Sequence, residues 1–306
     1  MQTLQGLLAL SLPFFLLVAL GWSAAWRGIV PTSALGALNA FVLFMALPAL
    51  LLQLGRGWAK DGFAGAAVLP LYALAGLVLG WLAWMSLRQE PSQGARGMAV
   101  LVTLFPNTGF LGVPLLSALL GQAAAGPLVA TIVFDLVVTS SICLALAGAK
   151  EHGLQRALRN PLPWAVGIGL ALGITGVSLP EPLERVIELL ALAVTPAALV
   201  ALGVALAVPQ PASNVQVAGR LAALKLLVHP LLAALLGGLA WQAGALTLAQ
   251  LQLLVLACAL PGAANVALLA ERLGQGGNLV PRAIMLSTLG ASFSLPLVAW
   301  MLGVRA

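Results

Sequence analysis

Two short stretches of the sequence place proline, glycine and small polar residues inside otherwise apolar segments. They read LFPNTGFLGVP (Leu104–Pro114) and LPGAANVALLAER (Leu260–Arg272). Proline removes a helical hydrogen bond and clashes with the preceding turn, and Asn, Thr and Gly offer the backbone other conformations. Each stretch therefore predicts a broken helix. The candidate binding residues lie at the breaks: Pro106, Asn107, Thr108, Gly109, Pro261, Gly262, Ala264 and Asn265.

A pair of helix breaks favours an anion. The helix that restarts after a break begins with free N–H groups and a partial positive charge of about half a unit. Two such helix starts that face one point form an anion site without a basic side chain, and Asn107, Thr108 and Asn265 would add directional hydrogen bonds. The alternative is that both prolines only kink the helices for packing. The site is favoured because the breaks occupy corresponding positions in the two halves of the chain.

Three ionisable residues also lie within apolar segments, where a charge is costly and suggests a function. Asp135 carries a coupling proton, holds the backbone of the crossing helices, or is a structural carboxylate bonded to neighbouring hydroxyls. Lys225 and His229 share one helix face because they are four residues apart. Lys225 either extends to the nearby cytosolic surface or attracts the anion at a cationic entrance. His229 suits a proton relay or neutral packing.

The elements that carry these residues must cross a membrane. Of 306 residues, 61% are hydrophobic and only 7% are charged, whereas soluble proteins are about half apolar and about a quarter charged. A bilayer core is crossed by about 20 apolar residues in a helix, and helices satisfy their own backbone groups in lipid. The sequence therefore predicts an all-α membrane protein with ten spans. These are residues 6–25, 34–55, 63–87, 97–120, 126–148, 161–176, 183–208, 218–241, 249–271 and 281–303.

The basic residues predict the orientation of these spans. With the N-terminus outside, nine of the 14 basic residues fall in inner gaps, four fall in outer gaps or at the C-terminus, and Lys225 lies within a span. Lys and Arg accumulate on the cytoplasmic side of a membrane. We therefore predict that the chain lies in the cytoplasmic (inner) membrane with both termini on its outer side, and that Arg156 and Arg159 are cytosolic. Because no basic cluster carries interleaved aromatic residues, a nucleic-acid partner is not expected.

The two halves of the chain resemble each other. ALPALLLQLG (46–55) matches VTPAALVALG (194–203) at five of ten positions. Each of four proline pairs joins a span to the fifth span after it, and because five is odd, the second half must enter the membrane from the opposite side. This predicts two inverted five-helix repeats, which are typical of secondary carriers, with spans four and nine broken. The pairs are Pro13/Pro163, Pro48/Pro196, Pro70/Pro230 and Pro106/Pro261.

The chain resembles the auxin efflux carrier family, which includes plant PIN proteins and bacterial malonate-transporter-like members and belongs to the bile/arsenite/riboflavin transporter superfamily. The stretches that carry the resemblance follow one another over nearly the whole chain. Besides the two breaks, they are LNAFVLFMALPALLLQ (Leu38–Gln53), RNPLPWAVGIGLAL (Arg159–Leu172) and LKLLVHPLL (Leu224–Leu232). The long central loop of the plant proteins is absent, because Ala149–Asn160 is a short connector.

The resemblance implies an elevator-type architecture like that of bile-acid symporters and the antiporter NhaA. Residues 1–57 and 158–210 would form a scaffold and a homodimer interface through spans two and seven. Residues 58–157 and 211–306 would form a moving transport domain in which broken helices four and nine cross. The implied substrates are small carboxylates such as malonate, malate or auxin-like acids, with no cofactor and no metal. The choice of acid, the direction and the coupling stay open.

Two other function classes suit a membrane chain. A passive anion channel needs a continuous polar lining, whereas the polarity here is confined to the breaks. A membrane-embedded enzyme needs a catalytic motif, and the sequence has no His-Glu-x-x-His, Gly-x-Ser-x-Gly or P-loop pattern, so we predict no enzyme. Cys143 and Cys258 lie in apolar runs without a paired motif, which favours packing over metal binding. Gly76-x-x-x-Gly80 and Gly169-x-x-x-Gly173 predict close helix packing.

Overall fold

The computed structural model describes residues 4–63, 65–90, 92–121, 124–146, 161–208 and 215–304. The connector Ala149–Asn160, with Arg156 and Arg159, lies outside these described residues, and so does Arg305. Within the described ranges the chain is helical apart from short turns, and one isolated antiparallel bridge joins Pro106 to Gly262. The all-helical prediction is confirmed for this part of the chain.

Six helices are long and apolar enough to cross a membrane: Gln5–Trp26, Thr32–Lys60, Val68–Ser86, Glu181–Ala207, Val215–Gln242 and Leu279–Met301. Four shorter apolar helices fall within the other predicted spans: Thr108–Leu120, Pro127–Cys143, Pro161–Thr175 and Leu248–Ala259. Large apolar side chains stand on the outside of the array, among them Leu192 and Phe293 with exposed fractions of 72% and 77%. Exposed apolar surface of this kind suits lipid, so the chain is a multi-pass membrane protein.

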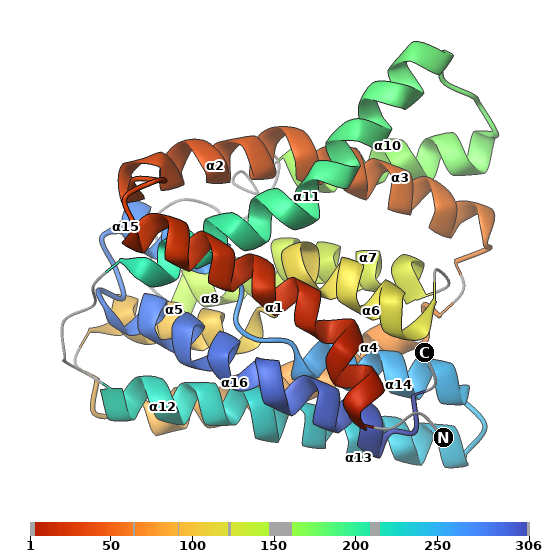
Figure 1. The fold of residues 1–306 in the computed structure, drawn as a ribbon. Coiled ribbons are helices and arrows are strands. Elements are labelled where there is room, and N and C mark those ends of the chain that lie inside the picture. Colours follow the sequence, from red (N-terminus) through yellow and green to blue (C-terminus); the bar gives the residue numbers. More distant parts are fainter. Residues whose placement is uncertain are drawn as a thin grey trace.

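The helices take the labels of Figure 1. In the first half they are α1 (Leu4–Trp26), α2 (Leu35–Phe41), α3 (Leu47–Lys60), α4 (Val68–Ser86), α5 (Gln93–Leu104), α6 (Val113–Leu120), α7 (Ala125–Phe134) and α8 (Ser140–Leu146). In the second half they are α10 (Pro161–Thr175), α11 (Glu181–Ala207), α12 (Val215–Ala223), α13 (His229–Gln242), α14 (Leu248–Ala259), α15 (Asn265–Leu273) and α16 (Leu279–Met301).

Widened π-helical turns interrupt several of these helices, and proline explains three of them. The turns η2 (Val42–Ala46), η3 (Thr108–Gly112) and η6 (Leu224–Val228) each end two residues before a proline, namely Pro48, Pro114 and Pro230. A proline ring clashes with the carbonyl four residues earlier, and a wider turn moves that carbonyl away. The turn η5 (Asp135–Thr139) has no proline after it. Instead, the Ser140 hydroxyl donates to the carbonyl of Asp135 at 2.8 Å. Such turns often mark functional sites.

The helices form layers that run roughly parallel to one another. In Figure 1, α2, α3, α10 and α11 lie together in the upper part, α12, α13, α14 and α16 lie in the lower part, and α6 and α7 lie between them. The helix α1 crosses the array diagonally and packs along α11, while α3 packs along α10. The polar breaks described below lie in the layer between these two groups, where helices of both contact them.

Glycines bring the helices of these two pairs into close contact. A side chain at Gly203 of α11 would overlap the backbone of α1 at Val18 and Gly21. A side chain at Gly169 of α10 would overlap the carbonyl of Leu52 in α3. The packing expected for Gly169-x-x-x-Gly173 is confirmed. For Gly76-x-x-x-Gly80 of α4, a Cβ atom at Gly80 would lie 3.1 Å from Leu104 of α5, whereas one at Gly76 would meet no atom within 4 Å, so the expected close packing is confirmed at Gly80 and wrong at Gly76.

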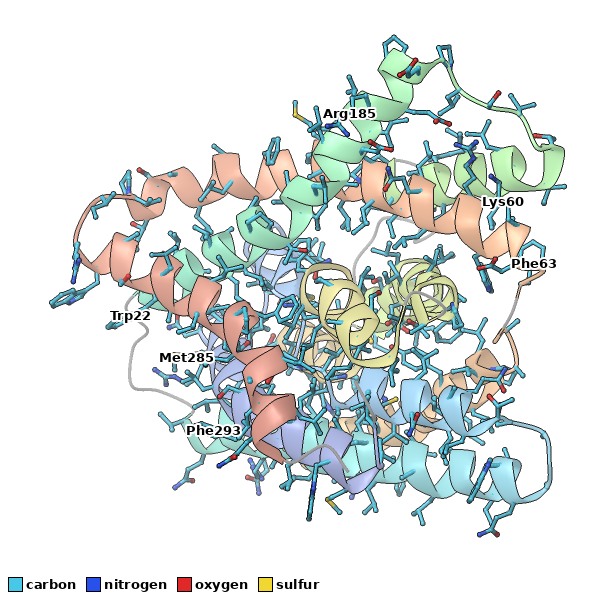
Figure 2. The ribbon with its side chains drawn as sticks, turned by 45° about the vertical axis from the view of Figure 1, so that its right-hand side comes forward. Trp22, Lys60, Phe63, Arg185, Met285 and Phe293 are labelled. Atoms are coloured by element: carbon cyan, nitrogen blue, oxygen red, sulfur yellow. The ribbon has the colours of Figure 1, made fainter. Side chains whose placement is uncertain are left out.

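Both ends of the described chain lie at the same end of the helix array, and the chain reverses at the opposite end between α1 and α2 and between α15 and α16 (Figure 1). Figure 2 shows Lys60 and Arg185 at the first end and Trp22 toward the other. Near Lys60, an ion pair of 2.6 Å between Arg56 and Glu184 joins α3 to α11.

Candidate functional site

Both predicted helix breaks are present. The helix α5 ends at Leu104 and the chain becomes extended at Phe105, where ψ is 104°. The helix α14 ends at Ala259, and Leu260 is extended with ψ of 148°. Each proline that follows lacks a backbone N–H and disfavours the helical conformation in the residue before it. The chain turns helical again at Thr108 in the first half and at Asn265 in the second.

The two breaks cross and are hydrogen-bonded to each other. Pro106 and Gly262 form the antiparallel bridge. The N–H of Asn107 donates to the carbonyl of Pro261 at 2.8 Å, and the N–H of Ala263 donates to the carbonyl of Phe105 at 2.9 Å. Backbone groups that lost their helical partners thus satisfy each other, as a buried backbone requires. The structure therefore brings together residues that are more than 150 positions apart in the sequence.

Side-chain polar atoms at the crossing are left without partners. Asn107 and Thr108 are buried, with exposed fractions of 2% and 1%. Among the described residues, Asn107 Nδ2, Thr108 Oγ1 and Asn265 Oδ1 have no hydrogen-bond partner. Buried polar groups normally have one, so these atoms are available to a ligand.

The surroundings of the breaks explain why glycine and alanine stand there. The Cβ position of Gly109 lies 3.5 Å from Leu47 of α3, and that of Gly112 would overlap Leu260 at the second break. The turn η3 also packs against α11. The first break therefore lies against the helices of the upper layer in Figure 1. At the second break, Gly262 and Ala264 have no side chain or only a methyl group, so they take up little space.

Lys225 does not extend to a surface, so the snorkelling prediction is wrong, whereas the attraction of an anion by Lys225 stays a prediction. Its side chain is 1% exposed. Its Nζ donates to the carbonyl of Leu104 at 3.3 Å and lies 3.0 Å from Nδ1 of His229. The shared helix face predicted for Lys225 and His229 is present. The ammonium lies at the C-terminal end of α5, where a cation is favoured by the helix dipole, and it holds the last carbonyl before the first break.

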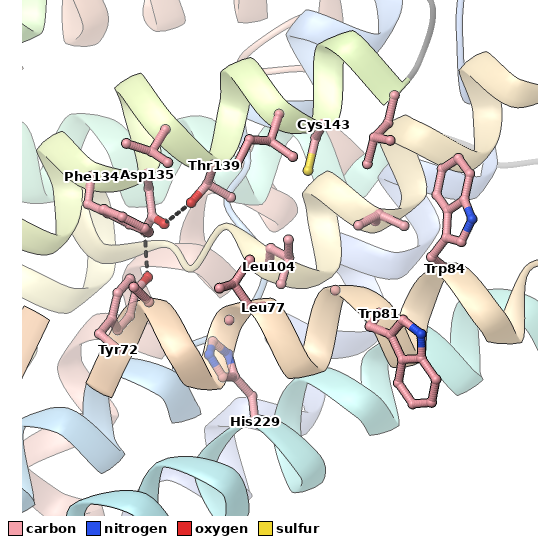
Figure 3. A pocket seen from close by; sticks show the side chains of 17 residues that line it. Tyr72, Leu77, Trp81, Trp84, Leu104, Phe134, Asp135, Thr139, Cys143 and His229 are labelled. Atoms are coloured by element: carbon pink, nitrogen blue, oxygen red, sulfur yellow. Dashed lines mark hydrogen bonds between the residues drawn. The ribbon is translucent and has the colours of Figure 1, made fainter. Parts of the chain in front are cut away.

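Asp135 joins two helices through its carboxylate. The hydroxyl of Tyr72 donates to Oδ2 at 2.5 Å, and the hydroxyl of Thr139 donates to Oδ1 at 2.9 Å (Figure 3). The hydroxyl partner within its own helix was expected, but Tyr72 of α4 was not. Tyr72 is the only tyrosine of the chain and lies in the middle of an apolar span, which is the signal that could have identified it.

Ser287 is a second residue that the sequence reasoning did not identify. Its hydroxyl accepts from the N–H of Gly262 at 3.1 Å and donates to the carbonyl of Ile284 at 3.0 Å. Ser287 and the next residue, Thr288, are both 2% exposed. Two adjacent hydroxyl residues in a long apolar helix were the available signal. Cys143 and Cys258 are buried and unbonded to each other.

Membrane-spanning helices that cross at two broken, polar centres define a multi-pass membrane protein with a buried polar site. The chain belongs to the family described as "Membrane transport protein", whose model matches residues 8–155 and 149–299. This is the auxin efflux and malonate-transporter-like family, so the resemblance drawn from the sequence motifs is confirmed.

Several relatives that match this chain over nearly its whole length are named as transporters. A protein of Rhizobium meliloti (strain 1021) named "Putative malonate transporter" is 29% identical over 300 residues, which cover 92% of this chain and 91% of the relative. The "Uncharacterized transporter YfdV" of Escherichia coli (strain K12) is 28% identical over 303 residues, which cover 94% of each chain. An "Uncharacterized transporter" of Methanothermobacter thermautotrophicus is 26% identical over 297 residues, 94% of this chain and 95% of the relative. These names indicate a membrane transporter rather than an enzyme.

Proposed function

We propose that the chain is a secondary transporter that moves small organic anions, carboxylates such as malonate, across the cytoplasmic membrane. The observation that carries this proposal is the hydrogen-bonded crossing of two broken helices with unpartnered buried polar atoms beside it. The name of the Rhizobium relative, which mentions malonate, supports a small dicarboxylate as the substrate. The substrate site would comprise Pro106, Asn107, Thr108, Gly109, Pro261, Gly262, Ala264 and Asn265.

Electrostatics favour a carboxylate at the crossing. Taking a carboxylate out of water costs several kcal/mol unless donors replace its hydration. The helices that begin at Thr108 and Asn265 place their N-terminal ends, which carry a partial positive charge, next to the crossing. Some of their first N–H groups already donate to carbonyls of the breaks, Thr108 to Pro106 at 2.7 Å and Val266 to Ala263 at 3.2 Å, so the helix dipoles and the asparagine side chains would attract the anion. An asparagine side chain turned by half a rotation presents its nitrogen in place of its oxygen, so Asn107 and Asn265 both supply donors.

Alternating access would follow from an inverted repeat of ten spans. The closest helix contacts support this symmetry. Gly21 and Gly203 connect spans one and seven, and Gly169 and Gly55 connect spans six and two. Gly21 and Gly169 are separated by the same 148 residues as Gly55 and Gly203. The proposal assigns α1, α2, α3, α10 and α11 to a fixed scaffold and the remaining helices to an elevator-type transport domain. Both termini would lie outside, and two copies would pack through spans two and seven.

Proton coupling would reside beside the first break. Asp135 is the candidate carrier of the proton, because it is buried and bonded to two hydroxyls that can transfer or hold one. The rings of Tyr72 and His229 lie 6.2 Å apart, and His229 in turn contacts Lys225. We assign Lys225 the role of a positioning residue, since it bonds the last carbonyl of α5 and lies away from both surfaces.

Counterflow in proteoliposomes tests the proposed function. Vesicles loaded with unlabelled malonate should take up labelled external malonate transiently above equilibrium, and the uptake should saturate. A passive channel would equilibrate the label without the overshoot, and an enzyme would move no label. Absence of saturable uptake for malonate, malate and aromatic acids alike would contradict the proposal.

A further inference from the structure

A cavity lies beside the first break, between the helices that carry Leu104, Asp135 and His229. It has a volume of about 260 Å³ and is bounded by α4, α5, η5, α8 and the start of α13 (Figure 3). Trp81 and Trp84 of α4 line it together with apolar residues of η5 and α8. Leu77 and Trp81 at its rim are exposed by 63% and 60%, so the cavity opens sideways toward the acyl chains.

Glycine creates the space on the α4 side. Gly76 and Gly80 are one turn apart and both line the cavity. A Cβ atom at Gly76 would meet nothing within 4 Å. Gly76 therefore leaves an open volume between α4 and the helices across from it, whereas at Gly80 a Cβ atom would already lie 3.1 Å from Leu104.

The inner end of the cavity is polar and contains one unused hydrogen-bond donor. An ammonium group can only donate, so Lys225 donates to Nδ1 of His229, and the imidazole proton then resides on Nε2. His229 is 1% exposed and lines the cavity, and Nε2 has no partner among the described residues. Figure 3 shows the imidazole ring turned toward the cavity, near Tyr72. A buried donor of this kind requires an acceptor.

We propose that this cavity is a second ligand site, for an uncharged, lipid-soluble molecule with a single ring and one hydrogen-bond acceptor. An apolar cavity of about 150 Å³ already accommodates benzene, so 260 Å³ accommodates a substituted ring. The aromatic walls favour such a ring, and the acceptor pairs with Nε2 of His229. An anion is excluded, because the residues that line the cavity include Asp135 and no lysine or arginine. The ligand class differs from that of the proposed transport substrate, although Asp135 and His229, which the proposed coupling uses, also line this cavity.

Fluorine NMR with three matched probes tests the proposal on the purified full chain. The probes are 4-fluoroacetophenone, 4-fluoroethylbenzene, which has a similar shape without the acceptor, and 4-fluorobenzoate, which is an anion. The ketone should show saturable line broadening, and the hydrocarbon should bind roughly five- to tenfold more weakly because it lacks one hydrogen bond. The benzoate should show no binding that the ketone displaces.

Site-directed variants separate this binding from partitioning into lipid. Gly76→Leu should fill the cavity and abolish saturable binding of the ketone, whereas Gly167→Leu, at an exposed α10 glycine that also has open space, should leave it unchanged. Val138→Phe fills the cavity from the opposite wall and replaces Gly76→Leu if that variant does not fold. Equal broadening in the filled and control variants would overturn the site, and equal affinity for ketone and hydrocarbon would overturn the role of His229.

Discussion

The two helix breaks have the same shape but different partners. At the first break, the last carbonyl of α5, that of Leu104, accepts a hydrogen bond from the buried ammonium of Lys225. At the second break, a neutral group is the partner: the Ser287 hydroxyl accepts from the N–H of Gly262. One break is thus held by a cation at a helix C-terminus and the other by a hydroxyl at the residue that bridges the two breaks.

This difference indicates that the two breaks have specialised. Both halves have a proline at the corresponding position of the break, Pro106 and Pro261, and a glycine close after it, at Gly109 and Gly262. Apart from Arg282 of α16, which is 5% exposed, the buried ionisable side chains Asp135, His229 and Lys225 gather around the first break, where all three are at most 2% exposed. A buried charge is costly to retain, so its presence on one side suggests that this break carries the coupling and the other contributes mainly to binding.

The largest effect is expected from Lys225→Met. Methionine keeps the length of the side chain but leaves the carbonyl of Leu104 and Nδ1 of His229 without their donor. Losing a hydrogen bond to a charged group costs about 1.5–3 kcal/mol, so the thermal unfolding temperature should fall and malonate binding should weaken at least about tenfold. The control is Lys60→Met, at an exposed lysine in α3. Unchanged unfolding and binding would show that the cation does not hold the first break.

Asp135→Asn should remove the coupling of transport to a pH gradient and leave the substrate site unchanged. An amide keeps the size of the carboxyl group and can still bond Tyr72 and Thr139, but it cannot exchange a proton. Accumulation driven by a pH gradient should be abolished, while exchange of internal for external malonate continues. Asp61→Asn, at an exposed position after α3, is the matched control. Normal pH-driven accumulation in a well-folded Asp135→Asn protein would assign the carboxylate a structural role only.

Asn107→Ala and Asn265→Ala compare the two breaks directly. If each amide donates one hydrogen bond to the carboxylate, each variant should lose about 1.5–3 kcal/mol of binding energy, or roughly ten- to a hundredfold in affinity. Isothermal titration with malonate measures the loss, and Asn278→Ala, at an exposed asparagine before α16, serves as the control. A large loss at one asparagine and none at the other would place the substrate on one break alone.

The positions of the six long apolar helices, the breaks and the pairing of Lys225 with His229 could be predicted because they depend on local sequence. Proline and glycine act on their own helix, and a spacing of four places two residues on one face. The contacts of Lys225 with Leu104, of Asp135 with Tyr72 and of Gly262 with Ser287 could not be predicted, because each joins different helices whose rotation the apolar pattern does not define. Lys225 was misplaced for a further reason: distance from a helix end does not say whether a long side chain turns outward or inward.

Ser287→Ala should have the smallest effect and thereby complete the comparison. The hydroxyl of Ser287 is one neutral partner of the Gly262 N–H, and a neutral hydrogen bond contributes about 0.5–1.5 kcal/mol. Malonate affinity should fall by a few fold at most, well below the effect of Lys225→Met, with pH-driven accumulation retained. Ser292→Ala is the control on the same helix, since its exposed hydroxyl bonds only the carbonyl of Leu289 in the described structure. If Ser287→Ala instead matched Lys225→Met in both unfolding and binding, the two breaks would be held equally firmly, and the cation at the first break would have to be explained by coupling alone.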